Sequence, residues 1–455
     1  MENRQINFFK SKDFNTVLKP FKKGTVVKID SFDIRETQKD LNIGLFGWYA
    51  ICPSKELKKN KLYYFSLYDE PLVLYRDENK NVRCIKNICP HRGASFFGGT
   101  LSDGVITCPY HGAKFSSGGS CQNLDRITCR HIVDNNYDNY AKRIHLSQYK
   151  TSEKNGYIFV HFSKKSETDL NNISEDTPIS NYELYENGFS HKDYVFEEVL
   201  VDFKCDWSRI IENHLDILHI FWVHGDTIPD KDVNKNVLVS FNQKININPS
   251  YIESIYYYKN NPTKEFIRIK YIPPGRILIY KGDPSSSRYL QVLDHIPLGN
   301  NKARVIVRHY RKFLQNKLLN NLLLFKETQR KIFYKIFDED YMILKTQTYN
   351  HDMGFISKDE IKLLGEDRII NYFWKWYKKS EDKDEPWKNI NKTQNLDVYD
   401  KVILKYPPEI KKLEIANNID IIRKTFVRFA APLIFFILFF HGSSLSSDFL
   451  YHFQK

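Results

Sequence analysis

The feature of this sequence that most constrains its fold is a pair of short motifs that each contain one cysteine and one histidine. The first motif is Cys89-Pro-His91, the second is Cys108-Pro-Tyr-His111, and sixteen residues separate His91 from Cys108. A glycine follows each histidine within two residues, and glycine gives a loop the conformational freedom to close around a metal. Two thiolates and two imidazoles can hold a zinc ion, or a [2Fe–2S] cluster with both histidines on one iron. We therefore predict that the two loops lie together and bind metal.

Short β-segments surround both motifs and predict a small all-β domain over residues 46–163. Turn signals such as Asp77–Asn81 and Ser117–Ser120 separate segments that are rich in Val, Ile, Tyr and Phe. The expected strands include Leu62–Leu67, Pro71–Tyr75, Val82–Ile85, Val105–Thr107 and Tyr157–Phe162.

A second group of metal-binding residue types follows about a hundred residues later, in the run Glu212-Asn-His-Leu-Asp216-Ile-Leu-His219 and then His224-Gly225. Asp216 and His219 are three residues apart, so they would share one face of an expected helix over Asp206–Leu218. That helix must end or bend before His224, and Gly225 suits such an end. Two histidines and one carboxylate form the facial triad of non-haem Fe(II) oxygenases. The alternative is an ordinary helix with histidines at the edge of a core.

The remaining sequence predicts an α+β domain with an antiparallel sheet over residues 193–400. Helices are expected at Asn316–Gln347 and Asp367–Lys379. Residues 1–45 are expected to form an extension packed on the first domain, residues 164–192 a linker or insertion, and residues 401–455 a tail with an apolar segment. The expected strands are Val237–Phe241, Ile252–Tyr258, Phe266–Ile272, Arg276–Tyr280 and Arg304–Tyr310.

The pair of cysteine–histidine motifs, Cys89-Pro-His91 and Cys108-Pro-Tyr-His111, resembles the cluster motif of Rieske proteins. Together with the later group of Asp216, His219 and His224, it resembles the α-subunits of Rieske non-haem iron oxygenases. High-potential Rieske proteins carry an extra cysteine in each loop, where this chain has Ala94 and Tyr110, so the resemblance is to the low-potential type. It implies an N-terminal all-β Rieske [2Fe–2S] domain followed by an α+β catalytic domain of the helix-grip type. The four residues implied as cluster ligands are Cys89, His91, Cys108 and His111. A zinc knuckle is the competing metal site.

The same resemblance implies a mononuclear Fe(II) held by His219 and His224, with Asp216 as a bridging carboxylate rather than a ligand. The third ligand should be an acid, and the segment Ile336–Gln347 resembles the corresponding segment of monooxygenase-type members. We predict Asp340 for this role. Asp338 and Glu339 remain alternatives, because a carboxylate-rich helix start is also an ordinary N-terminal charge preference.

Within this family, three features resemble the branch of pheophorbide a oxygenase and chlorophyllide a oxygenase. They are the Trp48-Tyr49 pair, the segment Asp367–Trp376 and the apolar run Phe429–Phe440. The chain lacks the C-terminal C-x-x-C of several members of that branch. The resemblance implies an oxygenase that uses O₂ and external electrons to oxidise a bulky apolar substrate, such as a chlorophyll-derived tetrapyrrole. The alternatives are a sterol oxygenase or desaturase of the same superfamily, and a Rieske electron-transfer protein.

Charge and cysteine content indicate the partners and the compartment. The net charge is +13, which favours an acidic partner. The sequence has no G-x-G-x-x-G motif for binding a dinucleotide, so the electrons must come from a separate protein. We expect a ferredoxin or ferredoxin-type reductase in this role. The basic residues are scattered through the sequence, which argues against a nucleic-acid-binding function. Seven cysteines, an odd number, suit a reducing cytoplasmic or organellar compartment.

Two further expectations concern assembly. The resemblance implies a homotrimer that places one subunit's cluster against the next subunit's iron across Asp216. The apolar run Phe429–Phe440 has twelve residues and contains Pro432, which is short for a bilayer span. It is either a buried helix or an anchor to a membrane surface, such as a thylakoid-type membrane.

Overall fold

The protein is described here from a computed structural model. The predicted linker at residues 164–192 and the apolar run Phe429–Phe440 lie outside the residues that it describes. No helix among the described residues is long and apolar enough to cross a membrane. The described residues are 27–36, 47–123, 143–162, 195–225, 227–228, 239–285, 287, 289–299, 301–312, 325–357 and 360–383.

The first domain is all-β, as predicted, and contains three small sheets. Their strand orders are β10-β5-β4-β3, β11-β12-β2 and β6-β7-β8-β9. The strands are β2 (Gly47–Pro53), β3 (Tyr63–Leu67), β4 (Glu70–Arg76), β5 (Val82–Lys86), β6 (Thr100–Ser102), β7 (Val105–Thr107), β8 (Lys114–Phe115), β9 (Cys121–Asn123), β10 (Gln148–Tyr149), β11 (Thr151–Lys154) and β12 (Tyr157–Phe162), with a 3₁₀ turn η1 at Ser54–Glu56.

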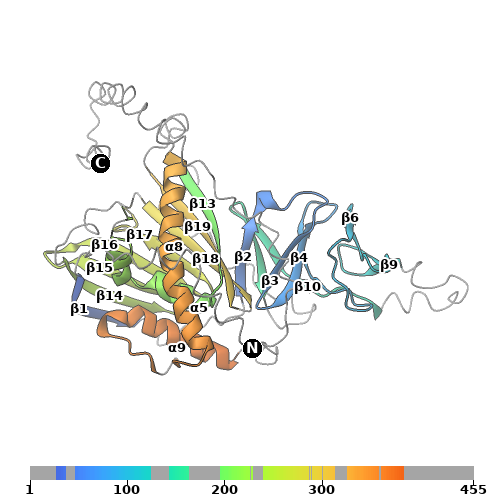
Figure 1. Cartoon of the computed structure of the whole chain (residues 1–455). Coiled ribbons are helices and arrows are strands. Elements are labelled where there is room, and N and C mark those ends of the chain that lie inside the picture. The colour runs from blue at the N-terminus through green and yellow to red at the C-terminus, as the bar shows by residue number, and fades with distance from the viewer. Residues whose placement is uncertain are drawn as a thin grey trace, which may run out of the picture. The chain divides into compact units, whose positions relative to one another are not determined.

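The second domain is built on one eight-stranded sheet of order β1-β14-β15-β16-β17-β18-β19-β13 (Figure 1). Neighbouring strands are antiparallel except β1 and β14, which are parallel. The predicted antiparallel sheet is therefore confirmed. The strands are β1 (Val27–Glu36), β13 (Val195–Phe203), β14 (Val239–Asn248), β15 (Tyr251–Tyr258), β16 (Asn261–Ile272), β17 (Arg276–Tyr280), β18 (Tyr289–Gly299) and β19 (Lys302–Arg311).

Strand β1 corrects one expectation about the N-terminal extension. It pairs with β14 at the edge of the catalytic sheet, so the expected packing of this segment on the first domain is wrong. The register with β14 shifts between Ile29 and Ser31, which is the mark of a β-bulge. The extra residue interrupts the alternation of Val27 and Ile29 with Phe32 and Ile34. For that reason the hydrophobic alternation of this segment does not predict a strand.

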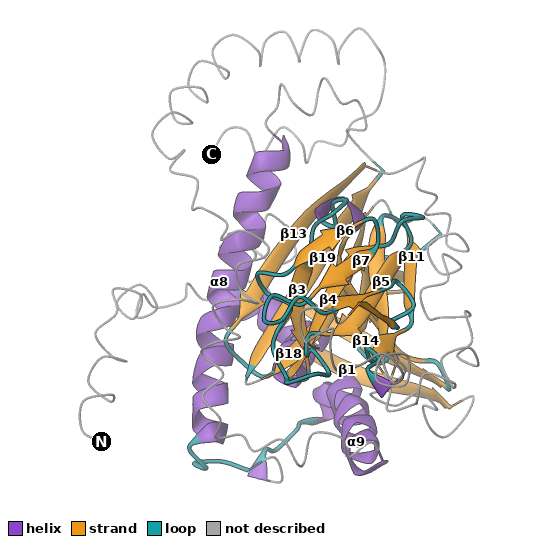
Figure 2. Ribbon diagram, turned by 90° about the vertical axis from the view of Figure 1, so that its right-hand side faces the viewer, coloured by secondary structure: helices purple, strands orange, loops and turns teal. Residues whose placement is uncertain are grey.

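Helices cover one face of this sheet (Figures 1 and 2). Helix α5 contacts β17, β18 and β19, α8 contacts β13 and α5, and α9 contacts β15 and α5. The helices are α5 (Trp207–Leu215), α6 (Leu218–Val223), α8 (Phe325–Asp352) and α9 (Arg368–Lys383), with a 3₁₀ turn η4 at Gly365–Asp367.

The single helix expected over Asp206–Leu218 is two helices, because the chain turns at Asp216. The backbone of Asp216 is extended, with φ −79° and ψ 121°. Its Oδ1 atom accepts a hydrogen bond of 2.7 Å from the Leu218 N–H and so satisfies a free donor in the first turn of α6. Aspartate competes with the helical backbone in this way, and it therefore favours helix starts over helix interiors.

A buried polar cluster fixes α5 against α8 and α9. Arg209 Nη1 donates to Glu212 Oε2 at 2.8 Å, and the indole N–H of Trp374 in α9 donates to the same oxygen at 3.1 Å. The Arg209 guanidinium also lies 4.8 Å from the Trp374 ring centre, and its Nη2 lies 2.6 Å from Nε2 of His351 in α8. Three helices that are distant in sequence thereby share one set of contacts.

The opposite face of the sheet packs on the first domain through a buried ionic group. Asp294 in β18 accepts hydrogen bonds from Arg276 Nε at 2.7 Å and from Arg308 Nη2 at 2.6 Å. The Arg308 guanidinium lies 3.7 Å from the ring centre of Tyr157 in β12. Burial alone would raise the pKa of Asp294, but the two arginines lower it below its usual value.

We predict that Asp294→Asn lowers the free energy of unfolding by about 3–5 kcal/mol, because it leaves the buried guanidinium of Arg308 and the half-buried guanidinium of Arg276 without their carboxylate. Since the folded pKa of Asp294 is lowered, its stabilisation is present above the usual aspartate pKa and is lost as the pH falls below that value. Urea denaturation at neutral and acidic pH checks both points. The exposed Asp103→Asn is the matched control, with a change within about 0.5 kcal/mol. Equal stabilities of the two variants would contradict the prediction.

Candidate metal centres

The two cysteine–histidine motifs form matching loops at one end of the first domain. The Cys89 N–H donates to the Ala94 carbonyl at 2.7 Å and the Cys108 N–H donates to the Ala113 carbonyl at 2.8 Å. In each loop the glycine four residues after the cysteine donates back to the cysteine carbonyl, at 2.8 Å and 3.0 Å. Both glycines have a positive φ, 75° and 74°, which side chains with a Cβ rarely adopt. The two motifs are therefore one loop structure used twice.

The loops place the cysteines inward and the histidines outward. Cys89 and Cys108 are buried in the same apolar cluster as Phe96, Ile106 and Phe115. The rings of His91 and His111 are partly exposed, and their centres lie 4.8 Å apart. Two adjacent thiols and two adjacent imidazoles are the donor set of a cluster with cysteines on one iron and histidines on the other.

The protonation of these groups suits metal binding. Burial raises the pKa of the Cys89 thiol to about 11, so its thiolate needs a cation as a partner. Burial, together with the neighbouring His111, lowers the pKa of His91. The His91 imidazole is therefore neutral at pH 7 and has a lone pair to offer.

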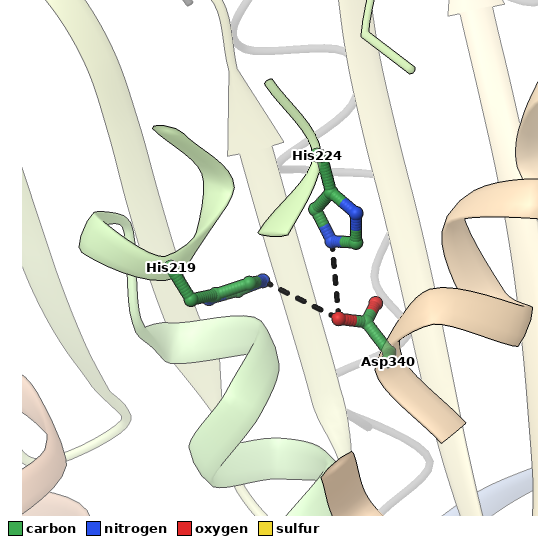
Figure 3. A group of neighbouring side chains, drawn as sticks. All are labelled: His219, His224 and Asp340. Carbon is green, nitrogen blue, oxygen red and sulfur yellow. Dashed lines mark ion pairs between the residues drawn. The ribbon is translucent and has the colours of Figure 1, made fainter. Parts of the chain in front are cut away.

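The second group of predicted residues converges from α6 and α8 (Figure 3). His219 Nε2 and His224 Nε2 lie 3.6 Å and 3.0 Å from the same atom, Asp340 Oδ1. One donor atom from each of the three residues lies within 4.8 Å of the others. Nε2 of His224 is buried without a hydrogen bond to any described residue. Two imidazole nitrogens that face one carboxylate oxygen at these distances are a donor set that fits a shared cation.

Two further carboxylates lie on the far side of the imidazoles, and one of them, Glu339, is hydrogen-bonded to its ring. His224 Nδ1 donates to Glu339 Oε2 at 2.8 Å, and a carboxylate only accepts, so the Nε2 atom of the neutral ring carries the lone pair. Asp216 Oδ2 lies 3.5 Å from His219 Nδ1. Outer carboxylates of this kind fix the tautomer and the ring orientation of metal-binding histidines.

The three candidate acids of α8 have different surroundings. Asp338 is exposed, Glu339 contacts His224 and Thr227, and Asp340 is 2% exposed and faces both histidines. Burial would raise the pKa of Asp340, but His224 and His219 lower it. Burial would lower the pKa of His224, but Asp340 and Glu339 raise it to about 9. A divalent cation would take the place of that proton.

Sequence reasoning missed some contacts of this site. Asn213 Nδ2 donates to Asp340 Oδ1 at 3.3 Å, and His214 Nδ1 lies 2.8 Å from His295 Nε2 in β18. Asn213 and His214 adjoin Glu212 in the motif, which was a usable signal. No sequence signal pointed to His295, because only the folded sheet brings this residue close to α5.

Comparison with known proteins matches both parts of the chain to domain families. Residues 47–140 match the Rieske [2Fe-2S] domain and residues 203–368 match the C-terminal domain of vanillate O-demethylase oxygenase. The first domain is thus a Rieske domain, and the second is homologous to the catalytic domains of mononuclear iron oxygenases.

Curated relatives include plant-type and bacterial oxygenases. Chloroplastic chlorophyllide a oxygenase of Chlamydomonas reinhardtii is 27% identical over 193 residues, which cover 42% of this chain and 26% of that protein. Protein TIC 55 of Pisum sativum is 22% identical over 323 residues, which cover 70% of this chain and 52% of that protein. The oxygenase component of dicamba O-demethylase from Stenotrophomonas maltophilia is 26% identical, over 39% of this chain and 47% of that protein. The chain therefore spans between a quarter and about half of the first two relatives.

Solved structures show the same fold. Dicamba monooxygenase bound to dicamba has a TM-score of 0.57 at 16% identity, and the match covers 76% of this chain and 99% of that one. The QL mutant of NdmA from Pseudomonas putida CBB5 with caffeine has a TM-score of 0.56 at 18% identity, over 75% of this chain and 92% of that one.

We predict that Asp340→Asn weakens binding of Co(II) to the second site far more than Asp338→Asn, its exposed neighbour. Glu339→Gln should weaken it about 10–100-fold, because it loses the acceptor that orients His224. Titration of the metal-free site with Co(II), followed by its visible absorption, gives the three affinities. Unchanged affinity in Asp340→Asn would assign the third donor to another acid.

Proposed function

We propose that this chain, which belongs to the Rieske oxygenase family, is a non-haem iron oxygenase that uses O₂ and externally supplied electrons to oxidise a bulky apolar substrate. The observation that carries the proposal is the pairing of a Rieske domain with the buried His219, His224 and Asp340 group in one chain. A Rieske electron-transfer protein would have no use for the second group. A zinc-dependent nucleic-acid binder would need neither domain.

The residues of the two centres have distinct roles in this proposal. Cys89, His91, Cys108 and His111 would hold the [2Fe–2S] cluster, whose chemistry when bound is one-electron transfer. His219, His224 and Asp340 would hold a mononuclear Fe(II), which supplies the O₂ chemistry when bound. Glu339 holds His224 in the tautomer that offers its Nε2 lone pair.

The two centres would communicate between subunits of a head-to-tail homotrimer. Heterologous contacts of this kind close into a ring when the rotation permits it. Each centre has an exposed aromatic side chain beside it, Tyr110 next to His111 and Trp222 between His219 and His224, with exposures of 60% and 53%. These side chains suit an interface. Asp216, which lies 3.5 Å from His219 and is partly exposed, would face the partner's cluster loop there.

The names of the relatives support the proposed substrate class. The chlorophyllide a oxygenases and the TIC 55 proteins are named as chloroplastic, so we propose a chlorophyll-derived tetrapyrrole as substrate and an organellar, thylakoid-type location. The bacterial relatives act on small aromatic compounds, as their names state. A sterol or another hydrophobic ring compound is the alternative. The net charge of +13 supports an acidic ferredoxin as the electron donor.

The proposal predicts O₂-dependent product formation from the full chain, a ferredoxin, a ferredoxin reductase and NADPH. Chlorophyllide a and pheophorbide a are the test substrates, a sterol is the comparison, and mass spectrometry detects the incorporated oxygen. Asp340→Asn should abolish turnover, and Asp338→Asn should retain it. Turnover without the ferredoxin, or an active Asp340→Asn variant, would contradict the proposal.

Asp216 has two separable roles, and the two variants Asp216→Asn and Asp216→Ala distinguish them. Asparagine keeps an oxygen for the Leu218 N–H but lacks the negative charge that faces His219, whereas alanine lacks both. We predict that both variants retain both metals and oxidise the reduced cluster at least about 10–100-fold more slowly in single turnover.

The measurement is stopped-flow absorption of the reduced cluster after mixing with O₂ and substrate. If the reduced cluster is oxidised at the normal rate in Asp216→Asn and slowly only in Asp216→Ala, the residue acts only by stabilising the start of α6. Normal rates in both variants would remove the case for a bridge between subunits.

A further inference from the structure

A pair of buried histidines lies beside the second metal centre and has no role in the proposal so far. His214 in α5 and His295 in β18 are 9% and 1% exposed. Their rings are 5.0 Å apart between centres, and Nδ1 of His214 lies 2.8 Å from Nε2 of His295. Burial lowers the pKa of both residues, that of His295 to about 4. Both rings are therefore neutral.

The hydrogen bonds of this pair fix the position of every ring proton. His295 Nδ1 lies 2.9 Å from the Gly275 carbonyl, which only accepts, so that nitrogen carries the proton of the ring. The Nε2 atom of His295 is then an acceptor, and the proton between the two rings belongs to His214 Nδ1. A neutral imidazole carries one proton, so His214 Nε2 is left with a lone pair.

That lone pair has no partner among the described residues. His214 adjoins Asn213, which donates to Asp340, and its ring lies 6.2 Å from that of Phe337, one helical turn before Asp340. It is not one of the three grouped metal donors. His214 Nε2 is also not one of the buried polar atoms that lack a partner, so it is accessible and can accept a hydrogen bond from water or from a bound ligand.

We infer that His214 Nε2 accepts a hydrogen bond from a hydroxyl or N–H group of the substrate, and that His295 and Gly275 hold it as an obligate acceptor. The inference rests on the proposed function, whose substrate class it narrows. A substrate with a donor near the oxidised position is favoured, and a ring that offers only acceptors at this point is disfavoured. His214 is a positioning residue in this scheme, because it orients the substrate and takes no part in bond breaking.

The first test is ¹⁵N NMR of the full chain with labelled histidines, an oxidised cluster and zinc in the mononuclear site. We expect the His214 ring to carry its proton on Nδ1 and none on Nε2. A proton on Nε2, or coordination of Nε2 to zinc, would overturn the inference. This readout does not depend on turnover, so it is independent of the oxygenase assay.

The second test compares indole with benzofuran, two bicyclic probes of the same shape of which only indole has an N–H donor. Without reductant, the chain should bind indole about tenfold more tightly than benzofuran. His214→Phe should reduce this ratio to about one. His309→Phe is the matched control, because His309 is 3% exposed on the same sheet and packs on Phe333, outside the pair; the ratio should persist there.

Equal affinities in the unmodified chain, an unchanged ratio in His214→Phe, or no binding of indole would each overturn the inference. If the ratio behaves as expected but the reconstituted system forms no product, the proposed function fails while the donor preference stands.

Discussion

The second metal centre depends on one buried carboxylate and two imidazoles that are brought together from separate helices. Asp340 lies in the middle of α8 and His224 at the end of α6, and the sheet beneath α8 and the cluster around Arg209 hold these elements in place. A buried carboxylate without a partner would be neutralised or destabilising. Its contacts with the two histidines keep it ionised. The group that stabilises this region is therefore also the group that can hold a divalent cation.

The sequence was most informative where chemistry is local. The spacing of Cys89, His91, Cys108 and His111 sufficed to place four donors in two loops, because each loop closes on its own backbone within five residues. The fold class and most strands followed from alternation and turn signals. The metal roles of individual residues remain predictions, because the metal affinities of the variants decide them.

What could not be predicted depends on contacts between distant segments. The choice among the acids of α8 needed the helix orientation, which buries Asp340 and exposes Asp338. The break of the helix at Asp216 needed the competition between its carboxylate and the backbone at Leu218. Strand β1 was not predicted, because a bulge shifts the alternation of its apolar residues. The partnership of His214 with His295 joins residues 81 positions apart.

If one chain holds two different iron centres, anaerobic iron analysis combined with EPR will show both. We expect about three iron atoms per chain, two in a Rieske cluster and one ferrous ion that becomes EPR-visible with nitric oxide. His91→Ala should remove only the cluster signal and His219→Ala only the nitrosyl signal. A content of two irons with no nitrosyl signal, zinc in place of iron, or the loss of both signals in either folded variant would contradict it.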